Sequence, residues 1–208
     1  PRSTLFPYTT LFRSRSLVSS VKEFAGLSDQ ELDRIETLVQ SLLKITRLDA
    51  GAIVLEKNAE NVADMMRDIE LHFAYRARQE KKEIILSGSD HLSLFCDRDW
   101  LNEAIDNIVK NAFDHTESGA TIRVAWKELP SGVQIVITDN GCGIHPEDIH
   151  HIFKRFYRSR FSKDTQGIGL GLPLAKAIIE AHGGLIEVES ELGIGTSFIM
   201  NFPIPTKL

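Results

Sequence analysis

Two glycine-containing segments of this chain carry the residue types of a nucleotide site. Residues 139–144 read D-N-G-C-G-I, and residues 167–172 read G-I-G-L-G-L. Glycines let the backbone approach a ligand closely, and a helix that starts after glycines offers free N–H groups and a positive dipole end to phosphates. A single G-x-G usually marks only a turn. The prediction therefore depends on both segments and on the aromatic, basic stretch I-F-K-R-F-Y-R at 152–158 between them.

A predicted helix upstream adds candidate metal chemistry. Residues 100–116 carry apolar side chains at helical spacing, and Asn107 and Asn111, four residues apart, share one face. Such a pair could be an ordinary solvated face. Beside the two glycine segments, it favours a site in which the Asn111 side-chain oxygen, a hard neutral ligand, binds Mg²⁺.

In this order, the asparagine helix, the D-x-G-x-G segment, the F-x-x-F segment and the G-x-G-L-G segment resemble the catalytic ATP-binding domain of sensor histidine kinases. That family belongs to the superfamily of DNA gyrase B, the Hsp90 chaperones and the MutL mismatch-repair ATPases. The resemblance covers roughly residues 55–205. It implies an α/β (α+β) fold, a two-layer α/β sandwich of the histidine kinase/Hsp90 type, with ATP and Mg²⁺ as cofactors.

Asp139 is expected to accept a hydrogen bond from the adenine amino group. A carboxylate facing an exocyclic amine selects adenine over guanine, because unpaired buried polar groups are costly. The resemblance implies the other roles. They are a wall near the base (Gly141, Gly143), water-mediated support of adenine (Thr196), Mg²⁺ binding (Asn111), a neighbouring polar contact (Asn107), wrapping of the triphosphate (Gly167, Gly169, Gly171 and Leu172) and a γ-phosphate contact (Arg158). Asn107 and Arg158 are the catalytic candidates.

The chain departs from the family pattern at two positions. Asp114 stands where many members have a lysine, which puts a phosphate contact there in doubt unless Asp114 points away. Lys110 could take the place of the family's lysine, but it projects about 100° from Asn111 on the helix. Arg155 stands where many relatives have proline. Arg155, Arg160 and Lys163 are each interpreted as solvated charges of a lid over residues 153–165.

Asn107 also separates phosphotransfer from hydrolysis. The ATP-hydrolysing relatives usually have a glutamate there as general base, and asparagine cannot take a proton. This favours transfer to a histidine. Glu103, one turn earlier on the same face, keeps a hydrolytic role open.

Alternating and helical patterns predict the elements that position these residues. Strands are expected at 55–60, 82–87 and 92–96, a hairpin at 121–127 and 132–138, and a closing hairpin at 185–190 and 196–202. Helices are expected at 61–79, 146–153 and 171–181.

A further helix is predicted at 28–49. Ser28 and Glu31 form a capping box, an apolar seam follows at 3-4-3 spacing, and Gly51 ends it. It resembles the second helix of the dimerisation and phosphotransfer hairpin, which implies a homodimer in the intact protein. No histidine of the seven is followed by the family's phosphoacceptor pattern. We therefore expect part of that hairpin at 15–51 and the catalytic ATP-binding domain at 52–208.

Residues 4–14, T-L-F-P-Y-T-T-L-F-R-S, match the conceptual translation of a common short-read sequencing adapter. Residues 1–14 are therefore interpreted as an assembly artefact, which belongs outside fold reasoning. On this hypothesis the natural protein extends further upstream.

Composition excludes several function classes. A net charge of −5 provides no basic surface, which disfavours nucleic-acid binding. No run approaches the about 18 apolar residues of a membrane span. Two cysteines far apart in sequence, without metal spacing, suit a reducing cytosol. The resemblance implies a cytoplasmic domain whose parent protein lies in the cell membrane through missing upstream segments.

The sequence therefore predicts the C-terminal part of a two-component sensor histidine kinase. The intact protein would bind Mg·ATP, phosphorylate a histidine absent from this chain, and pass the phosphoryl group to a response-regulator receiver domain. Three alternatives remain: a stand-alone ATPase of the gyrase or chaperone type, a serine-kinase regulator of the anti-sigma type, and an interaction module that binds no nucleotide.

Overall fold

A computed structural model describes residues 31–159 and 167–204 of the chain. The adapter-like segment, Ser28 of the predicted capping box, Arg160 and Lys163 lie outside these ranges. The chain forms two compact units, residues 1–40 and 41–208, and each is described by itself. In the first unit, residues 31–40 are helical, and Leu32, Ile35 and Val39 are exposed.

The second unit begins with the continuation of this helix to residue 49. There Ile45 and Leu48 are buried, whereas Leu43 is exposed. Gly51 follows with φ +62, a left-handed conformation that glycine adopts without steric conflict. The backbone N–H of Ala52 closes the helix end by donating to the Arg47 carbonyl (2.9 Å). The predicted glycine stop is thus confirmed.

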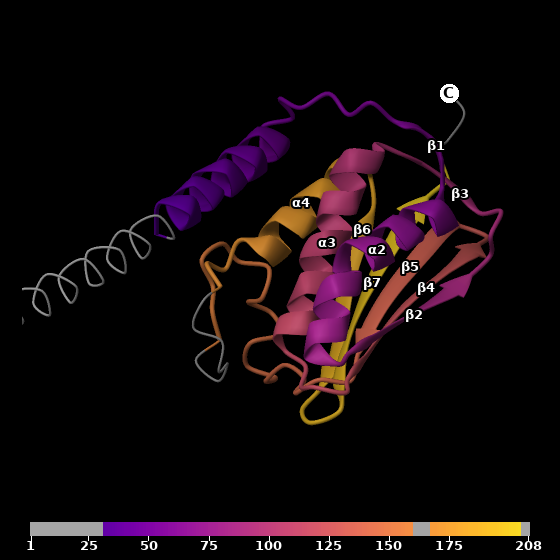
Figure 1. Ribbon diagram of the computed structural model, residues 1–208. Coiled ribbons are helices and arrows are strands. Elements are labelled where there is room, and N and C mark those ends of the chain that lie inside the picture. Colours follow the sequence, from indigo (N-terminus) through magenta and orange to yellow (C-terminus); the bar gives the residue numbers. More distant parts are fainter. Residues whose placement is uncertain (1–30, 160–166, 205–208) are drawn as a thin grey trace, which may run out of the picture. The chain divides into compact units, whose positions relative to one another are not determined.

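A mixed sheet forms one layer of the second unit (Figure 1). Among the described residues it has five strands, β2 (Glu83–Gly88), β4 (Thr121–Leu129), β5 (Gly132–Asp139), β7 (Gly195–Pro203) and β6 (Leu185–Glu191), in that spatial order. β2 pairs parallel with β4, and the other pairs are antiparallel. A separate two-stranded ladder joins β1 (Asn58–Asn61) to β3 (Ser93–Cys96).

Three helices form the second layer on one face of the sheet (Figure 1). They are α2 (Val62–Glu80), α3 (Arg98–Asp114) and α4 (Gly171–Ala181). Asn61 caps α2, and Asp97 caps α3 through a bond from the Trp100 N–H. The expected two-layer α/β sandwich is confirmed, because buried apolar stripes of α3 and α4 face the alternating buried residues of β4, β5 and β7.

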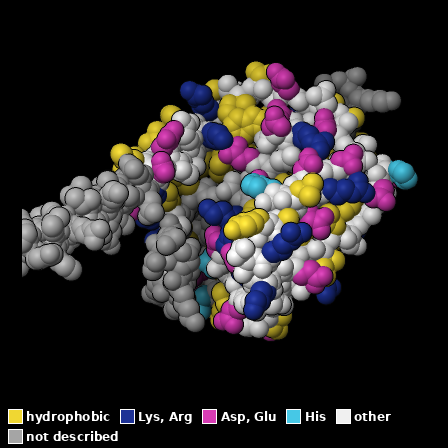
Figure 2. All heavy atoms as spheres, viewed as in Figure 1, with side chains coloured by type: hydrophobic (Ala, Val, Ile, Leu, Met, Phe, Trp, Pro, Cys, Tyr) yellow, Lys and Arg dark blue, Asp and Glu magenta, His cyan; other side chains and the backbone are white. Residues whose placement is uncertain are grey.

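On the helix-bearing face, basic and acidic side chains are interspersed rather than gathered by sign (Figure 2). Among the described residues, none of the helices combines the length and the apolar run that a membrane span requires.

The predicted helix at 146–153 is wrong, because this segment is a series of turns. Its backbone bonds run mainly from a residue to the third one before it, as from His151 N–H to the Asp148 carbonyl (2.7 Å). The Asp148 carboxylate accepts a hydrogen bond from the Tyr157 hydroxyl (2.6 Å), which holds the turns against a later part of the chain. A side-chain contact nine residues along the chain thus overrides the weak local helix propensity.

Candidate nucleotide-binding site

Asp139 is the last residue of β5 and is buried. Its Oδ1 accepts a hydrogen bond from the backbone N–H of Gly141 (2.8 Å). Burial raises the pKa of the Asp139 carboxyl, against the opposing effect of hydrogen bonds from the backbone of Gly141 and Thr196. Because one oxygen of this buried carboxylate is bonded to the Gly141 N–H, the other can accept a hydrogen bond from a ligand.

Thr196 lies directly opposite Asp139 in the β5–β7 ladder and is also buried. The Thr196 hydroxyl contacts the Ser190 hydroxyl (3.0 Å), and Ser190 Oγ accepts from the Ile144 N–H (2.8 Å). Ser190 therefore joins the closing hairpin to the first glycine segment. Sequence reasoning missed this role, because strand pairing places residue 190 opposite residue 196 and the loop after β5 brings residue 144 to it.

The glycines of the first segment are required by close backbone packing. A Cβ at Gly141 would lie 2.3 Å from the His115 carbonyl oxygen, and a Cβ at Gly143 would lie 2.2 Å from that of Glu191. Gly143 also has φ +71. In addition, the Cys142 N–H donates to the His115 carbonyl (3.3 Å). The segment is thus fixed between the end of α3 and the β6–β7 turn.

Two of the residues predicted at the phosphates, Asn107 and Gly171, meet where α3 faces the start of α4. A Cβ at Gly171 would lie 3.0 Å from Asn107 Oδ1, so the Asn107 side chain packs against the first residue of α4. Asn107 Nδ2 donates to the Glu103 carbonyl (2.8 Å). Asn111 lies one turn further along the same half-buried face of α3.

The N-terminus of α4 can bind an anion. Among the described residues, no side chain caps it, and Pro173 has no N–H. The backbone N–H groups of Gly171 and Leu172 are therefore the donors that this helix end offers. Gly169, with φ +76, approaches the Tyr157 carbonyl so closely that a Cβ would lie 2.6 Å from it. Gly167 is exposed at the edge of residues 160–166.

Asn111 carries an amide oxygen, a ligand type that Mg²⁺ accepts. Within residues 31–159 and 167–204, no group of three or more His, Cys, Asp or Glu side chains could hold a metal ion. Mg²⁺ commonly binds through one or two protein oxygens together with substrate phosphates. The donor set thus fits a cation that arrives with a nucleotide.

Asp114 points toward α2. Its Oδ1 pairs with Arg76 Nη2 (2.7 Å), while Arg76 Nε bonds Glu80 (2.6 Å). The Arg76 guanidinium also lies over the Phe113 ring. Asp114 is therefore part of an ion-pair group between α2 and the end of α3. Lys110, the weak substitute for the family's lysine, is exposed.

Glu103 is paired with Lys44 (Nζ to Oε1, 2.6 Å), and the Lys44 ammonium also lies over the Trp100 ring. This pairing limits the availability of Glu103 as a general base. Arg155 forms an ion pair with Asp49 rather than standing alone in solvent. Arg158 is exposed, directly before the end of the described segment at residue 159.

Comparisons with known proteins identify the relatives of this chain. The sequence profile of the family described as "Histidine kinase-, DNA gyrase B-, and HSP90-like ATPase" matches residues 96–206. Sensor protein SrrB of Staphylococcus aureus (strain NCTC 8325 / PS 47) is 32% identical over 187 residues, which are 89% of this chain and 32% of SrrB. The chain thus spans about a third of the length of the curated relatives that it matches.

Solved structures of histidine kinases are similar to this chain. The catalytic domain of the histidine kinase ThkA has a TM-score of 0.63 at 26% identity, covering 72% of this chain and 96% of that one. Full-length ShkA, solved in complex with AMPPNP, has a TM-score of 0.75 at 26% identity, covering 99% of this chain and 41% of that one. ThkA in complex with the response regulator protein TrrA shares the fold, with a TM-score of 0.70 at 24% identity over 88% of this chain and 51% of that one.

Proposed function

Because this chain belongs to the family of histidine kinase-, DNA gyrase B- and HSP90-like ATPases, we propose that it binds Mg·ATP between the end of β5 and the facing parts of α3 and α4. The main observation that supports this proposal is the buried Asp139 carboxylate. Its Oδ1 is held by the Gly141 N–H, and its Oδ2 accepts the adenine amino group. Gly141 and Gly143 form the wall beside the base, and Thr196 supports the base through water.

The phosphates extend from the base toward α4. The N–H groups of Gly171 and Leu172 donate to phosphate oxygens, favoured by the positive end of the helix dipole. Gly167 and Gly169 let the preceding backbone follow the triphosphate. Asn107, which packs against Gly171, is a neighbouring polar contact. Asn111 holds Mg²⁺, which when bound neutralises charge on the phosphates.

The reaction that we propose is transfer of the γ-phosphoryl group to a histidine on another part of the intact protein, then to an aspartate of a response-regulator receiver domain. The similarity to SrrB and ThkA supports a two-component sensor kinase. In phosphoryl transfer the protein contributes positioning and charge stabilisation. Arg158 is our candidate for the γ-phosphate contact, and Asn107 contributes polar stabilisation without taking a proton.

The domain assignment is also a proposal. Residues 15–51 would be part of a dimerisation and phosphotransfer hairpin, and residues 52–208 the catalytic domain. The exposed Leu32, Ile35 and Val39 support a helix that is covered in a homodimer. The length of SrrB beyond the matched region supports a larger parent protein, which we propose lies in the cell membrane with this part in the cytoplasm.

A stand-alone ATPase is the second candidate function. It would need a general base near the γ-phosphate. Asn107 cannot serve, and Glu103 is engaged by Lys44. We therefore favour the kinase.

The test is calorimetric titration of the chain with Mg·ADP and with Mg·GDP. We expect binding of ADP and none of GDP. We also expect no acid-labile phosphate on the chain after incubation with Mg·ATP, because the acceptor motif is absent. Equal binding of both nucleotides, or of neither, would refute the site. Phosphate release without phosphohistidine, once a histidine-bearing hairpin is supplied, would favour the ATPase.

A further inference from the structure

His182 lies at the end of α4 remote from the proposed phosphate site and is buried. Its Nδ1 contacts the Ile178 carbonyl oxygen (2.8 Å), within its own helix. Its Nε2 accepts a hydrogen bond from the backbone N–H of Asp97 (3.1 Å), the N-cap residue of α3. The ring therefore connects the C-terminus of α4 to the N-terminus of α3.

These partners assign the state of the imidazole. A carbonyl oxygen at Nδ1 requires an N–H there, and an N–H group facing Nε2 requires a lone pair there. The ring is thus neutral, with the proton on Nδ1. Burial lowers the pKa of His182, and Lys57 acts in the same direction, whereas the Asp97 carboxylate and the Nδ1 bond to the Ile178 carbonyl oppose the shift. The bond that Nε2 accepts from the Asp97 N–H also favours the neutral ring. Protonation would place an N–H against the Asp97 N–H.

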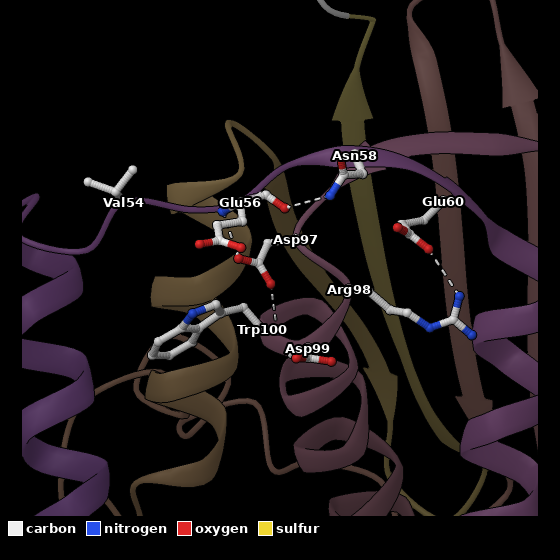
Figure 3. A pocket seen from close by; sticks show the side chains of 8 residues that line it. All are labelled: Val54, Glu56, Asn58, Glu60, Asp97, Arg98, Asp99 and Trp100. Carbon is white, nitrogen blue, oxygen red and sulfur yellow. Dashed lines mark hydrogen bonds and ion pairs between the residues drawn. The ribbon is translucent and has the colours of Figure 1, made fainter.

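The same junction includes the linker that precedes β1. The Lys57 ammonium donates to the Ala181 carbonyl (3.2 Å), and the Glu56 N–H donates to Asp97 Oδ2 (2.9 Å). Figure 3 shows Asp97 between Glu56 and Trp100 beside a cavity of about 370 Å³. The charged groups that influence the pKa of the ring are Lys57 from the linker and Asp97 at the N-cap of α3.

Two of the contacts between α3 and α4 lie toward opposite ends of their shared face. At one end Asn107 meets Gly171, and at the other Asp97 meets His182. Ten residues separate Asn107 from Asp97 and eleven separate Gly171 from His182, each about 15 Å of helix. The two helices therefore run antiparallel, and a shift along their axes at His182 would displace Asn107 relative to Gly171.

We infer that His182 is a positioning residue for the phosphate end of the nucleotide site, because it fixes the axial position of α4 against α3. This inference rests on the proposed nucleotide function. The adenine end depends on Asp139 of β5 and on Thr196 of β7, which lie opposite each other in the sheet and are not part of α4. Loss of the His182 bond is therefore expected to weaken phosphate binding selectively.

The test compares ADP with adenosine by calorimetry, in the presence of Mg²⁺, for the unmodified chain and two variants. His182→Leu replaces the imidazole with an apolar side chain of similar size and so removes the Nε2 acceptor. We expect its ADP affinity to fall by about tenfold, equivalent to one lost hydrogen bond, with adenosine affinity within about twofold. His182→Gln can offer an oxygen near the Nε2 position, and we expect it to keep most of the ADP affinity.

A purely structural role would lower the melting temperature without changing the ratio of the two affinities in folded protein. An unchanged ratio in His182→Leu would therefore overturn the inference while leaving the nucleotide site intact. Failure of the unmodified chain to bind ADP would overturn both proposals.

If His182→Leu does not fold, the same ratio is measured for the unmodified chain and His182→Gln as the pH falls from about 7.5 to about 4.5. The range extends below the usual titration range of histidine because burial lowers the pKa of His182. We expect the preference for ADP to decrease in the unmodified chain and to persist in His182→Gln. The same decrease in both proteins would contradict the inference.

Discussion

Replacing Asp139 by asparagine is expected to abolish most nucleotide affinity without lowering stability. The asparagine oxygen can still accept from the Gly141 N–H, which is 2.8 Å from Asp139 Oδ1. The amide nitrogen then stands where Oδ2 would accept the adenine amino group, so two donors face each other. A hydrogen bond to a charged group contributes about 1.5–3 kcal/mol, which corresponds to roughly 10- to 150-fold in Kd.

Although Asp139→Asn weakens nucleotide binding, it should leave the melting temperature unchanged or raise it. Burial is the largest influence on the Asp139 carboxyl and raises its pKa, so the ionised form is disfavoured in the folded state. When the pKa of a carboxyl group is higher in the folded than in the unfolded chain, its ionised form lowers the free energy of unfolding. This penalty disappears as the pH falls to the pKa of the unfolded chain. At neutral pH the neutral asparagine avoids this burial penalty. We expect the melting temperature of Asp139→Asn to equal or exceed that of the unmodified chain, with the gap closing at acid pH.

The assay combines calorimetric titration with Mg·ADP and thermal unfolding on the same samples. Asp90→Asn is the matched control, because it makes the same chemical change at an exposed site paired with Arg67. An Asp139→Asn variant that binds ADP within about twofold of the unmodified chain would refute the assignment of Asp139 to adenine. A large fall in melting temperature would refute the argument from burial.

Three further changes test other parts of the site. Asn111→Ala is expected to remove most of the Mg²⁺ dependence of ADP binding while adenosine binding is unchanged, and titrations with and without Mg²⁺ check this; an unaltered Mg²⁺ effect would argue against Asn111 as the ligand. Gly143→Ala should lower the free energy of unfolding by about 2 kcal/mol or more, since it combines a left-handed φ with a backbone clash. Gly119→Ala, also left-handed but in open space, should lower it by only about 1 kcal/mol in the same denaturant experiment; equal losses would contradict the packing argument. Asp114→Lys should lower the free energy of unfolding by about 1 kcal/mol through loss of the Arg76 pair and leave ADP affinity nearly unchanged. A double-mutant cycle with Arg76→Met isolates that pair, and tighter ADP binding by Asp114→Lys would show that residue 114 faces the phosphates.

The sequence alone determined the order and type of most elements. The helices α2, α3 and α4 and the two hairpins follow from local periodicity, because 3.6-residue and 2-residue repeats report directly which side chains face the core. The left-handed φ of Gly51, Gly143 and Gly169 also has a local cause, since glycine tolerates that conformation best. The motifs were sufficient to predict the family, because their order and spacing are properties of the chain itself.

Only the tertiary structure decided which way several side chains face. Asp114 could have faced the phosphates, but it pairs with Arg76, 38 residues away. The 146–153 segment could have been helical, but Asp148 bonds Tyr157 and the backbone remains in turns. His182 bonds Asp97 across 85 residues, and Ser190 reaches Ile144 across 46. A local repeat carries no information on such contacts, because they depend on how the chain folds back on itself, and in three of the four the partners are distant in the chain.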